Sequence, residues 1–184
     1  MTVNVRPQRP ADARAVRAVV TDAFGDTGRV ADLAEDLLAG PSRVALVAEL
    51  DSLIVGHVQL SRGWLDAPRE LVDVLVLSPL ATTPRHQRTG IGSELVRAAL
   101  SAAGELRAPL VFLEGVPAFY PRFGFEPGRP LGFTPPSTRI PDRAFLVARL
   151  PAYQPWMSGA FVYPDAFWVH DCVGLRETDP RWTG

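Results

Sequence analysis

A short glycine-containing turn, Gln87 to Gly92, joins an apolar segment to a helical pattern and constrains the fold of this chain more than any other feature. Residues 71 to 81 (LVDVLVLSPLA) read as a buried strand, and residues 93 to 103 (SELVRAALSAA) read as an amphipathic helix. Because Gly90 and Gly92 have no Cβ, the backbone can turn tightly and direct its N–H groups toward a ligand, where the helix dipole adds partial positive charge. The sequence therefore predicts a pyrophosphate-binding site at this turn.

Three known glycine-rich motifs could stand at this position. A Walker A loop requires a lysine, and every basic residue of this chain is an arginine. A dinucleotide fingerprint would require glycine where Leu95 stands and a turn directly after the strand, although Glu114 lies about where a ribose-binding acid would be. The third pattern, Gln/Arg-x-x-Gly-x-Gly/Ala, is matched in full by residues 87 to 92. This third reading is preferred, and the dinucleotide reading stays as its rival.

A second motif, Phe119 to Phe125 (FYPRFGF), follows the next strand-like run at residues 110 to 113. Together with the stretch from Leu80 to Gly92 (LATTPRHQRTGIG), it resembles the two signature segments of the GNAT N-acetyltransferase superfamily, including small bacterial members. The resemblance covers approximately residues 3 to 126. It implies an α/β fold with a mixed, mostly antiparallel central sheet flanked by helices and with splayed fourth and fifth strands, and it implies acetyl-CoA as the cofactor and no metal.

The composition agrees with one intracellular domain. A chain of 184 residues is long enough for a single core, and a net charge of −1 argues against a general nucleic-acid binder. The one cysteine, Cys172, cannot form an internal disulfide, and the absence of lysine excludes Schiff-base chemistry on the chain. We find neither an apolar leader nor a membrane-length run, so we expect a cytoplasmic protein with no membrane partner.

Periodicity and breaker residues predict the order of the elements. We expect a first strand near residues 3 to 5, helices over 10–24, 28–39 and 90–103, a hairpin of strands 44–49 and 53–60, strands 71–81, 110–114 and 144–150, and a short helix near 117–123. The proline-rich stretch 126–143 reads as a surface loop. Residues 1–150 form the predicted GNAT domain, and the aromatic-rich residues 151–184, with a strand near 159–163, are predicted to pack on it. Packing against a second subunit, which would give a homodimer, is the alternative.

The resemblance assigns the cofactor-binding residues. The backbone of Leu80, Ala81 and Thr82 aligns with the positions that bind the acetyl and pantetheine groups, and Pro79 in this strand suggests a bulge that frees an N–H group. The pyrophosphate is assigned to the turn that follows, which consists of Arg88, Thr89, Gly90, Ile91, Gly92 and Ser93. Arg85 and His86 are further candidates for contacts with the phosphates.

The resemblance also assigns the proton-transfer residues. Tyr120 aligns with the tyrosine that protonates the coenzyme A sulfur, with a packed aromatic side chain as the alternative role. Glu114 is the preferred base for the acceptor amine, while Asp73 and His57 stay open as alternatives. The chain departs from the family in lacking an asparagine after the fifth strand and in having a short connection to Tyr120. Acceptor-pocket candidates are Trp64, Phe119 and Phe133.

These observations predict an acetyl-CoA-dependent N-acetyltransferase that moves an acetyl group to a primary amine by direct transfer in a ternary complex. The acceptor could be a small molecule or a peptide. A non-catalytic acyl-CoA-binding regulatory domain is the second hypothesis, and an NAD(P)-binding oxidoreductase is the third.

Overall fold

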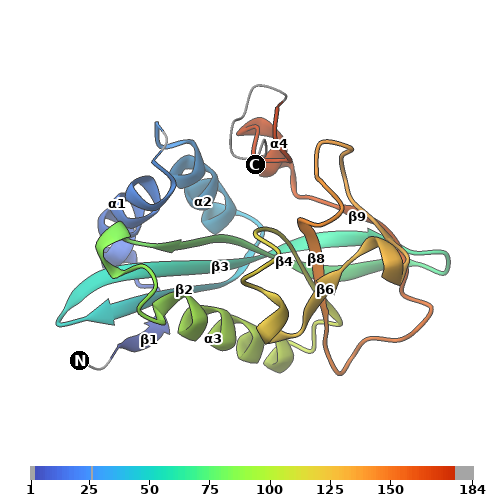
Figure 1. Ribbon diagram of the computed structural model, residues 1–184, viewed down its shortest axis with the longest axis horizontal. Helices are drawn as coiled ribbons and strands as arrows, with labels where there is room; N and C mark the ends of the chain where they lie inside the picture. Colours follow the sequence, from blue (N-terminus) through green and yellow to red (C-terminus); the bar gives the residue numbers. More distant parts are fainter. Residues whose placement is uncertain (1–2, 26, 177–184) are drawn as a thin grey trace.

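The computed structural model describes residues 3–25 and 27–176, and within them one mixed sheet organises the molecule (Figure 1). Its strands are β1 (Asn4–Pro7), β2 (Ser42–Leu50), β3 (Leu53–Asp66), β4 (Leu71–Thr82), β5 (Leu110–Glu114), β6 (Phe125–Pro127), β7 (Phe133–Thr134), β8 (Phe145–Arg149) and β9 (Gly159–Val162). They are hydrogen-bonded in the order β1-β2-β3-β4-β5-β8-β6, while β9 pairs with both β3 and β7. Of these described pairs, only β4–β5 and β7–β9 are parallel, which confirms the mostly antiparallel sheet. A dinucleotide-binding fold would instead require a mainly parallel sheet.

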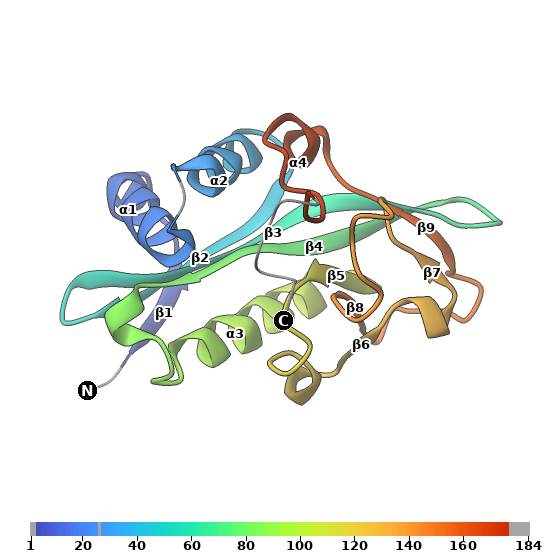
Figure 2. The same cartoon turned by 45° about the horizontal axis from the view of Figure 1, so that its top comes forward.

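Helices cover both faces of this sheet (Figure 2). The helices α1 (Ala13–Phe24) and α2 (Arg29–Ala39) lie on one face, together with the short α4 (Asp165–Val169), and α3 (Ile91–Glu105) lies on the other. Single 3-10 turns occur at Pro10–Asp12, Pro84–His86, Pro121–Phe123 and Arg129–Leu131. The helix α3 forms because apolar residues recur at helical spacing, and it buries Leu95, Val96, Ala99 and Ala103 against the sheet.

Several predicted boundaries were wrong. The strand β3 extends to Asp66, well beyond residue 60, because residues 61 to 66 pair with the first half of β4 despite their polar composition. The stretch 126–143 is not a plain loop: it contains the end of β6, a 3-10 turn and β7. The short helix expected near 117–123 is only a 3-10 turn at Pro121–Phe123, and α4 was not predicted.

A bulge in β4 separates the two halves of that strand. Leu60 of β3 pairs with Leu77, and Val58 pairs with Leu80, so Ser78 and Pro79 together oppose a single residue of β3. The extra residue reverses the alternation of the strand, so Leu77 and Leu80 both pack into the core on the α3 face. This confirms the bulge predicted from the proline.

The strands β4 and β5 are splayed, as predicted. They pair only at Leu75 with Val111 and at Val76 with Phe112, and they separate toward their carboxyl ends. From Leu77 to Thr82, the edge of β4 that faces away from β3 pairs with none of the described strands. The backbone groups on this edge are therefore open to a ligand.

Three aromatic side chains of the C-terminal part, Phe161, Tyr163 and Phe167, are buried, whereas Trp168 is 44% exposed. The rings of Phe112 and Phe161 stack at 4.4 Å, and those of Tyr163 and Phe167 stack at 4.3 Å. All four belong to one core cluster on the face covered by α2. Residues 177–184, including Trp182 of the predicted extension, lie outside the described residues. Throughout residues 3–25 and 27–176, no helix combines the length and apolarity needed to cross a lipid bilayer.

Candidate active site

The turn before α3 presents backbone N–H groups without partners. Among the described residues, none accepts a hydrogen bond from the backbone N–H of Arg88, Thr89, Gly90, Ile91 or Gly92. These groups are the unsatisfied donors at the start of a 15-residue helix, where the helix dipole is positive. The turn therefore has the hydrogen-bond donors and the positive electrostatic potential that binding of a diphosphate needs.

The backbone conformation of this turn requires glycine at one position. Gly90 adopts φ +97°, and a Cβ built there would meet no atom within 4 Å, so the space beside it is open. At Gly92 a Cβ would lie 3.6 Å from the ring of Phe119 and 3.8 Å from the hydroxyl of Thr82. The turn is therefore exposed on one side, and on the other it touches the end of β4 and the FYPRFGF segment.

Polar side chains around the turn divide into two groups. Gln87 donates a hydrogen bond to the Thr82 carbonyl at 3.2 Å, and Thr89 donates to the His86 carbonyl at 2.7 Å, so both stabilise the protein itself. By contrast, Arg85 and Arg88 are exposed and form no ion pair with any described residue. Two guanidinium groups are thus available for phosphates beside the bare N–H groups. The backbone N–H of Ser93 is already bonded to Gly90 at 3.0 Å.

The three predicted residues at the end of β4 lie beyond the bulge. Leu80 packs on the α3 face and Ala81 on the α1 face. Thr82 faces the start of α3, because its hydroxyl lies near the position of a Gly92 Cβ. Their backbone forms the open edge of the splay and leads directly to the turn at Gly90, which gives a continuous path for an extended ligand.

Tyr120 lies at the other side of the splay. Its ring packs against Gly115 and makes edge contacts with Phe119 and Phe125 at centroid distances of 4.9 and 5.6 Å. Burial raises the pKa of Tyr120 to about 12, and no described residue bonds its hydroxyl. The phenol therefore stays protonated at neutral pH and can serve as a hydrogen-bond and proton donor.

Glu114 ends β5 and faces the opposite side of the sheet. Along β5, Leu113 packs into the core on the α3 face, and the next side chain, Glu114, lies on the α2 face. Its Oε2 accepts a hydrogen bond of 3.0 Å from the backbone N–H of Gly174. Burial raises the pKa of the neighbouring Tyr163 well above its usual value, and the Glu114 carboxylate adds to this rise. The splay thus has a carboxylate on one face and a phenol on the other.

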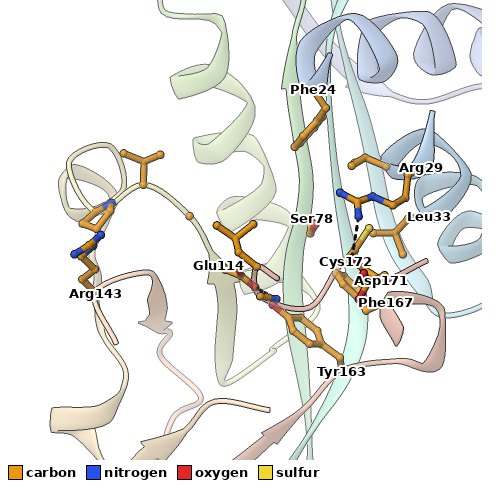
Figure 3. Close-up of a pocket in the computed structure, with 16 residues that line it drawn as sticks. Phe24, Arg29, Leu33, Ser78, Glu114, Arg143, Tyr163, Phe167, Asp171 and Cys172 are labelled. Carbon is orange, nitrogen blue, oxygen red and sulfur yellow. Dashed lines mark hydrogen bonds between the residues drawn. The ribbon is translucent and has the colours of Figure 1, made fainter. Parts of the chain in front are cut away.

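The Glu114 carboxylate lies in a cavity of about 520 Å³ (Figure 3). One wall comes from α1 and α2 (Phe24, Arg29 and Leu33), the floor from Ser78 and the end of β5, and the remaining wall from the C-terminal residues. The cavity is therefore on the α2 face, whereas α3, which begins at the glycine turn of residues 87–92, lies on the other. Two ligands, one bound on each face of the sheet, could therefore contact each other through the gap between β4 and β5.

Two alternative bases lie elsewhere. Asp73 is on the α3 face, ion-paired with Arg62 and opposite Trp64, and it lines a different hollow of about 620 Å³. The partner expected for a mid-strand carboxylate is therefore Arg62. His57 is fully buried beneath α1, and this burial lowers the pKa of its imidazole to about 4. Neither residue reaches the cavity that holds Glu114.

The three acceptor-pocket candidates from the sequence do not line that cavity either. Trp64 belongs to the hollow beside Asp73, and Phe133 is buried in the core against Phe112 at 5.2 Å. Phe119 packs beside the glycine turn, near Gly92. The cavity is lined instead by residues that sequence reasoning missed, among them Arg29, Tyr163, Phe167 and Gly174. No local pattern marks them, since only the fold brings the C-terminal residues to Glu114.

The open sheet splayed at its centre, with bare N–H groups at the start of α3, agrees with the acyltransferase fold that the GNAT resemblance implies. A family model described as the acetyltransferase (GNAT) domain matches residues 4–128, and the chain belongs to this family. The *Escherichia coli* uncharacterized N-acetyltransferase YjhQ is 34% identical over 119 residues, which cover 63% of this chain and 65% of YjhQ. The *E. coli* uncharacterized N-acetyltransferase YhbS is 31% identical over 126 residues, which cover 66% of this chain and 72% of YhbS.

Solved structures agree with the fold. The *E. coli* YhbS structure in complex with CoA superposes with a TM-score of 0.80 at 26% identity and covers 90% of this chain and 91% of that one. A GNAT family acetyltransferase from *Brucella melitensis* in complex with acetyl-CoA gives a TM-score of 0.72 at 26% identity, with 90% and 98% coverage. The likeness thus extends past residue 128, where the family model ends, into the C-terminal part of the chain.

Proposed function

We propose that this protein is an acetyl-CoA-dependent N-acetyltransferase that transfers the acetyl group directly to a primary amine in a ternary complex. The observation that carries the proposal is the splay of β4 and β5, with a turn of unpaired backbone N–H groups on one side and a cavity containing Glu114 on the other. The relatives named as N-acetyltransferases and the two neighbours crystallised with CoA and acetyl-CoA support it.

Backbone groups would hold the cofactor. The N–H groups of residues 88 to 92 and the guanidinium groups of Arg85 and Arg88 suit the pyrophosphate and the other phosphates. The open edge of β4 from Leu77 to Thr82 suits the pantetheine amides and the thioester carbonyl. When bound, acetyl-CoA supplies an activated acetyl thioester. The Ser93 hydroxyl is assigned a supporting role at the same turn.

Glu114 would act as the base. A primary amine with a pKa of about 10 is largely protonated at neutral pH and must lose a proton before it can attack. The hydrogen bond from Gly174 fixes the carboxylate in the cavity on the acceptor side. Glu114 would first take the ammonium proton, directly or through water, and release it to solvent. The second proton would leave the nitrogen by the same route as the new N–C bond forms and the C–S bond breaks.

Tyr120 would supply the proton that the leaving thiolate needs. Because its pKa is raised to about 12 and a thiol has a pKa of about 8.5, proton transfer is unfavourable in solution and depends on close positioning. The packing of the ring against Gly115 and Phe125 provides such a fixed position. The transfer then ends with a neutral thiol and an amide, and Tyr120 regains its proton from solvent.

The test follows thiol release from acetyl-CoA with a panel of primary amines, using the wild-type protein and Tyr120→Phe. We expect release that depends on an amine, intersecting initial-velocity lines as a ternary complex requires, and a large loss of turnover in the variant with unchanged coenzyme A affinity. Tight coenzyme A binding without turnover on any amine would favour the regulatory alternative. Parallel velocity lines would contradict direct transfer. The single cysteine keeps the cytoplasm as our proposed compartment, and a homodimer stays a prediction.

A further inference from the structure

Exposed apolar side chains gather at the cavity beside Glu114. Phe24 (labelled in Figure 3) is 38% exposed and Val116 is 62% exposed; both are large apolar residues, and both line this cavity. The buried Leu33 and Phe167 continue the same apolar wall. Apolar surface that is hollowed and left open to solvent is typical of a binding site for an apolar group.

The charges around this cavity disfavour a polycation. Two carboxylates, those of Glu114 and Asp171, line it together with the guanidinium groups of Arg29 and Arg143. Asp171 is also paired with Arg139 at 3.3 Å and with Arg176 at 2.8 Å. Because positive and negative groups are balanced in this lining, the cavity has no acidic excess that would attract several ammonium groups.

Residues 165–175, here called the closing segment, form one wall and are fixed to two other parts of the fold. His170 Nε2 lies 2.6 Å from Asp36 Oδ2 on α2, and the Leu175 N–H donates to the Arg139 carbonyl at 3.3 Å. Between these contacts Val173 is fully buried. The segment therefore spans from α2 to the loop before β8 and bounds the cavity opposite α1.

Glycine at position 174 is required for this closure. Gly174 adopts φ +62°, and a Cβ there would lie 2.7 Å from the backbone of Arg139. Only glycine allows the segment to approach so closely, and this approach brings its N–H to Glu114. The same contact thus positions the carboxylate and closes the cavity.

From these observations we infer that the acceptor is a small monoamine with an apolar body, and that the closing segment excludes polypeptide acceptors. The inference rests on the proposed acetyl transfer and specifies its substrate class. A cavity of about 520 Å³ has the size typical of small-molecule sites, roughly 300–1,000 Å³. An extended peptide needs a groove open at both ends, whereas the closing segment, joined to α2 at His170 and to the loop before β8 at Leu175, bounds one side of this site. The apolar body contacts Phe24, Leu33 and Phe167 while the ammonium group reaches Glu114.

The first experiment compares three probes that each present a primary amine: 2-phenylethylamine, spermidine and an eight-residue peptide with a free N-terminus. Thiol release from acetyl-CoA gives kcat/KM, and calorimetric titration of the coenzyme A-loaded protein gives affinity independently of turnover. We expect 2-phenylethylamine to exceed both other probes at least tenfold in each measurement. A peptide or spermidine that equals or exceeds it would overturn the inference.

Two pairs of variants test the roles of the apolar wall and of the closing segment. Phe24→Ser should raise the KM for 2-phenylethylamine about tenfold and leave coenzyme A affinity unchanged, whereas Leu53→Ser, at a 66% exposed apolar residue that starts β3, should change neither. His170→Ala should release the closing segment and raise the peptide rate relative to 2-phenylethylamine at least tenfold. Val169→Ser, at a 76% exposed position beside it, is the matched control. Unchanged discrimination in His170→Ala and Phe24→Ser would refute the assigned roles.

The outcomes separate the inference from the proposed activity. If coenzyme A does not bind, or if no amine in any panel releases thiol, the transfer activity fails. If thiol is released but polypeptide or polyamine acceptors are preferred, the activity stands and the substrate class is wrong. Calorimetry still decides the substrate class in a protein without turnover, because binding of 2-phenylethylamine beside coenzyme A does not need the reaction.

Discussion

The ring of Tyr120 lies directly on the α-carbon of Gly115, so that a Cβ at Gly115 would be 2.5 Å from Tyr120 Cε2. Gly115 follows Glu114, which ends β5. The two proposed proton-transfer residues are therefore coupled through one short piece of backbone: the same chain end that directs Glu114 to the α2 face also supports the Tyr120 ring on the α3 face.

Gly115→Ala should displace the Tyr120 ring. Because the added methyl group cannot fit, we expect an overpacking cost of about 1–3 kcal/mol and a clear loss of kcat. Thermal unfolding, in which 1 kcal/mol corresponds to about 2–4 °C at this chain length, and steady-state kinetics measure the two effects. Gly104→Ala in α3, where a Cβ meets nothing within 4 Å, is the control and should not lower stability. Equal behaviour of the two variants would contradict the assigned packing.

Gly90→Ala should weaken coenzyme A binding. The side chain has open space, but φ +97° is unfavourable for alanine by about 1–2 kcal/mol, so the turn relaxes and redirects its N–H groups. We expect the Kd for coenzyme A to rise about tenfold in calorimetry, with the fold retained in circular dichroism. Gly104→Ala again provides the comparison, since it adds the same methyl group near the other end of α3. A Kd that matches the wild type would place the pyrophosphate elsewhere.

Replacement of the two candidate carboxylates should separate their roles. Glu114→Gln removes the proposed base but keeps the shape of the side chain, and we expect kcat/KM for an amine to fall about 100-fold or more at neutral pH. Asp73→Asn breaks only an exposed ion pair with Arg62, which is worth at most about 1 kcal/mol, so the rate should stay near that of the wild type. The measurement is thiol release at saturating acetyl-CoA. The assignment of the base is wrong if Asp73→Asn is the slower enzyme.

His57 should lower the stability of the folded protein at acidic pH. Its pKa is about 4 in the folded state and 6.5 in the ordinary state, so between these values the unfolded chain binds a proton that the folded protein does not. Stability is therefore complete above pH 6.5 and falls as the pH drops toward 4, by about 3 kcal/mol in total. Urea unfolding from pH 7 to pH 4 measures this slope.

His57→Leu is the matching variant. The ring lies in a small apolar space under α1, near the ion pair of Arg17 and Glu35, and leucine fills much of the same volume without a titratable group. The variant should lose less stability than the wild type between pH 7 and pH 4, because other titrating groups act on both proteins alike. Identical slopes would show that His57 does not titrate in this range.

The sequence predicted the parts of the site that depend on local geometry. The glycine turn before α3, the bulge at Pro79 and the position of Glu114 at a strand end follow from residue types and periodicity, which act over a few neighbouring residues. The sheet order and the splay followed from the family resemblance. The predicted end of β3 at residue 60 was wrong because hydrogen bonding between strands outweighs local composition there: residues 61–66 form a strand because β4 pairs with them.

The amino-acid sequence by itself determined the glycine turn before α3 and the position of Glu114 at a strand end, because each follows from a local pattern; phosphate binding at the turn and the roles of Tyr120 and Glu114 stay predictions. Only the tertiary structure decided which side of the sheet each group faces, what surrounds Glu114, and that Asp73 and His57 lie elsewhere. The closing segment shows the reason: Gly174 reaches Glu114 across 60 residues of sequence, and no short-range pattern encodes a contact made by two distant surfaces packing together.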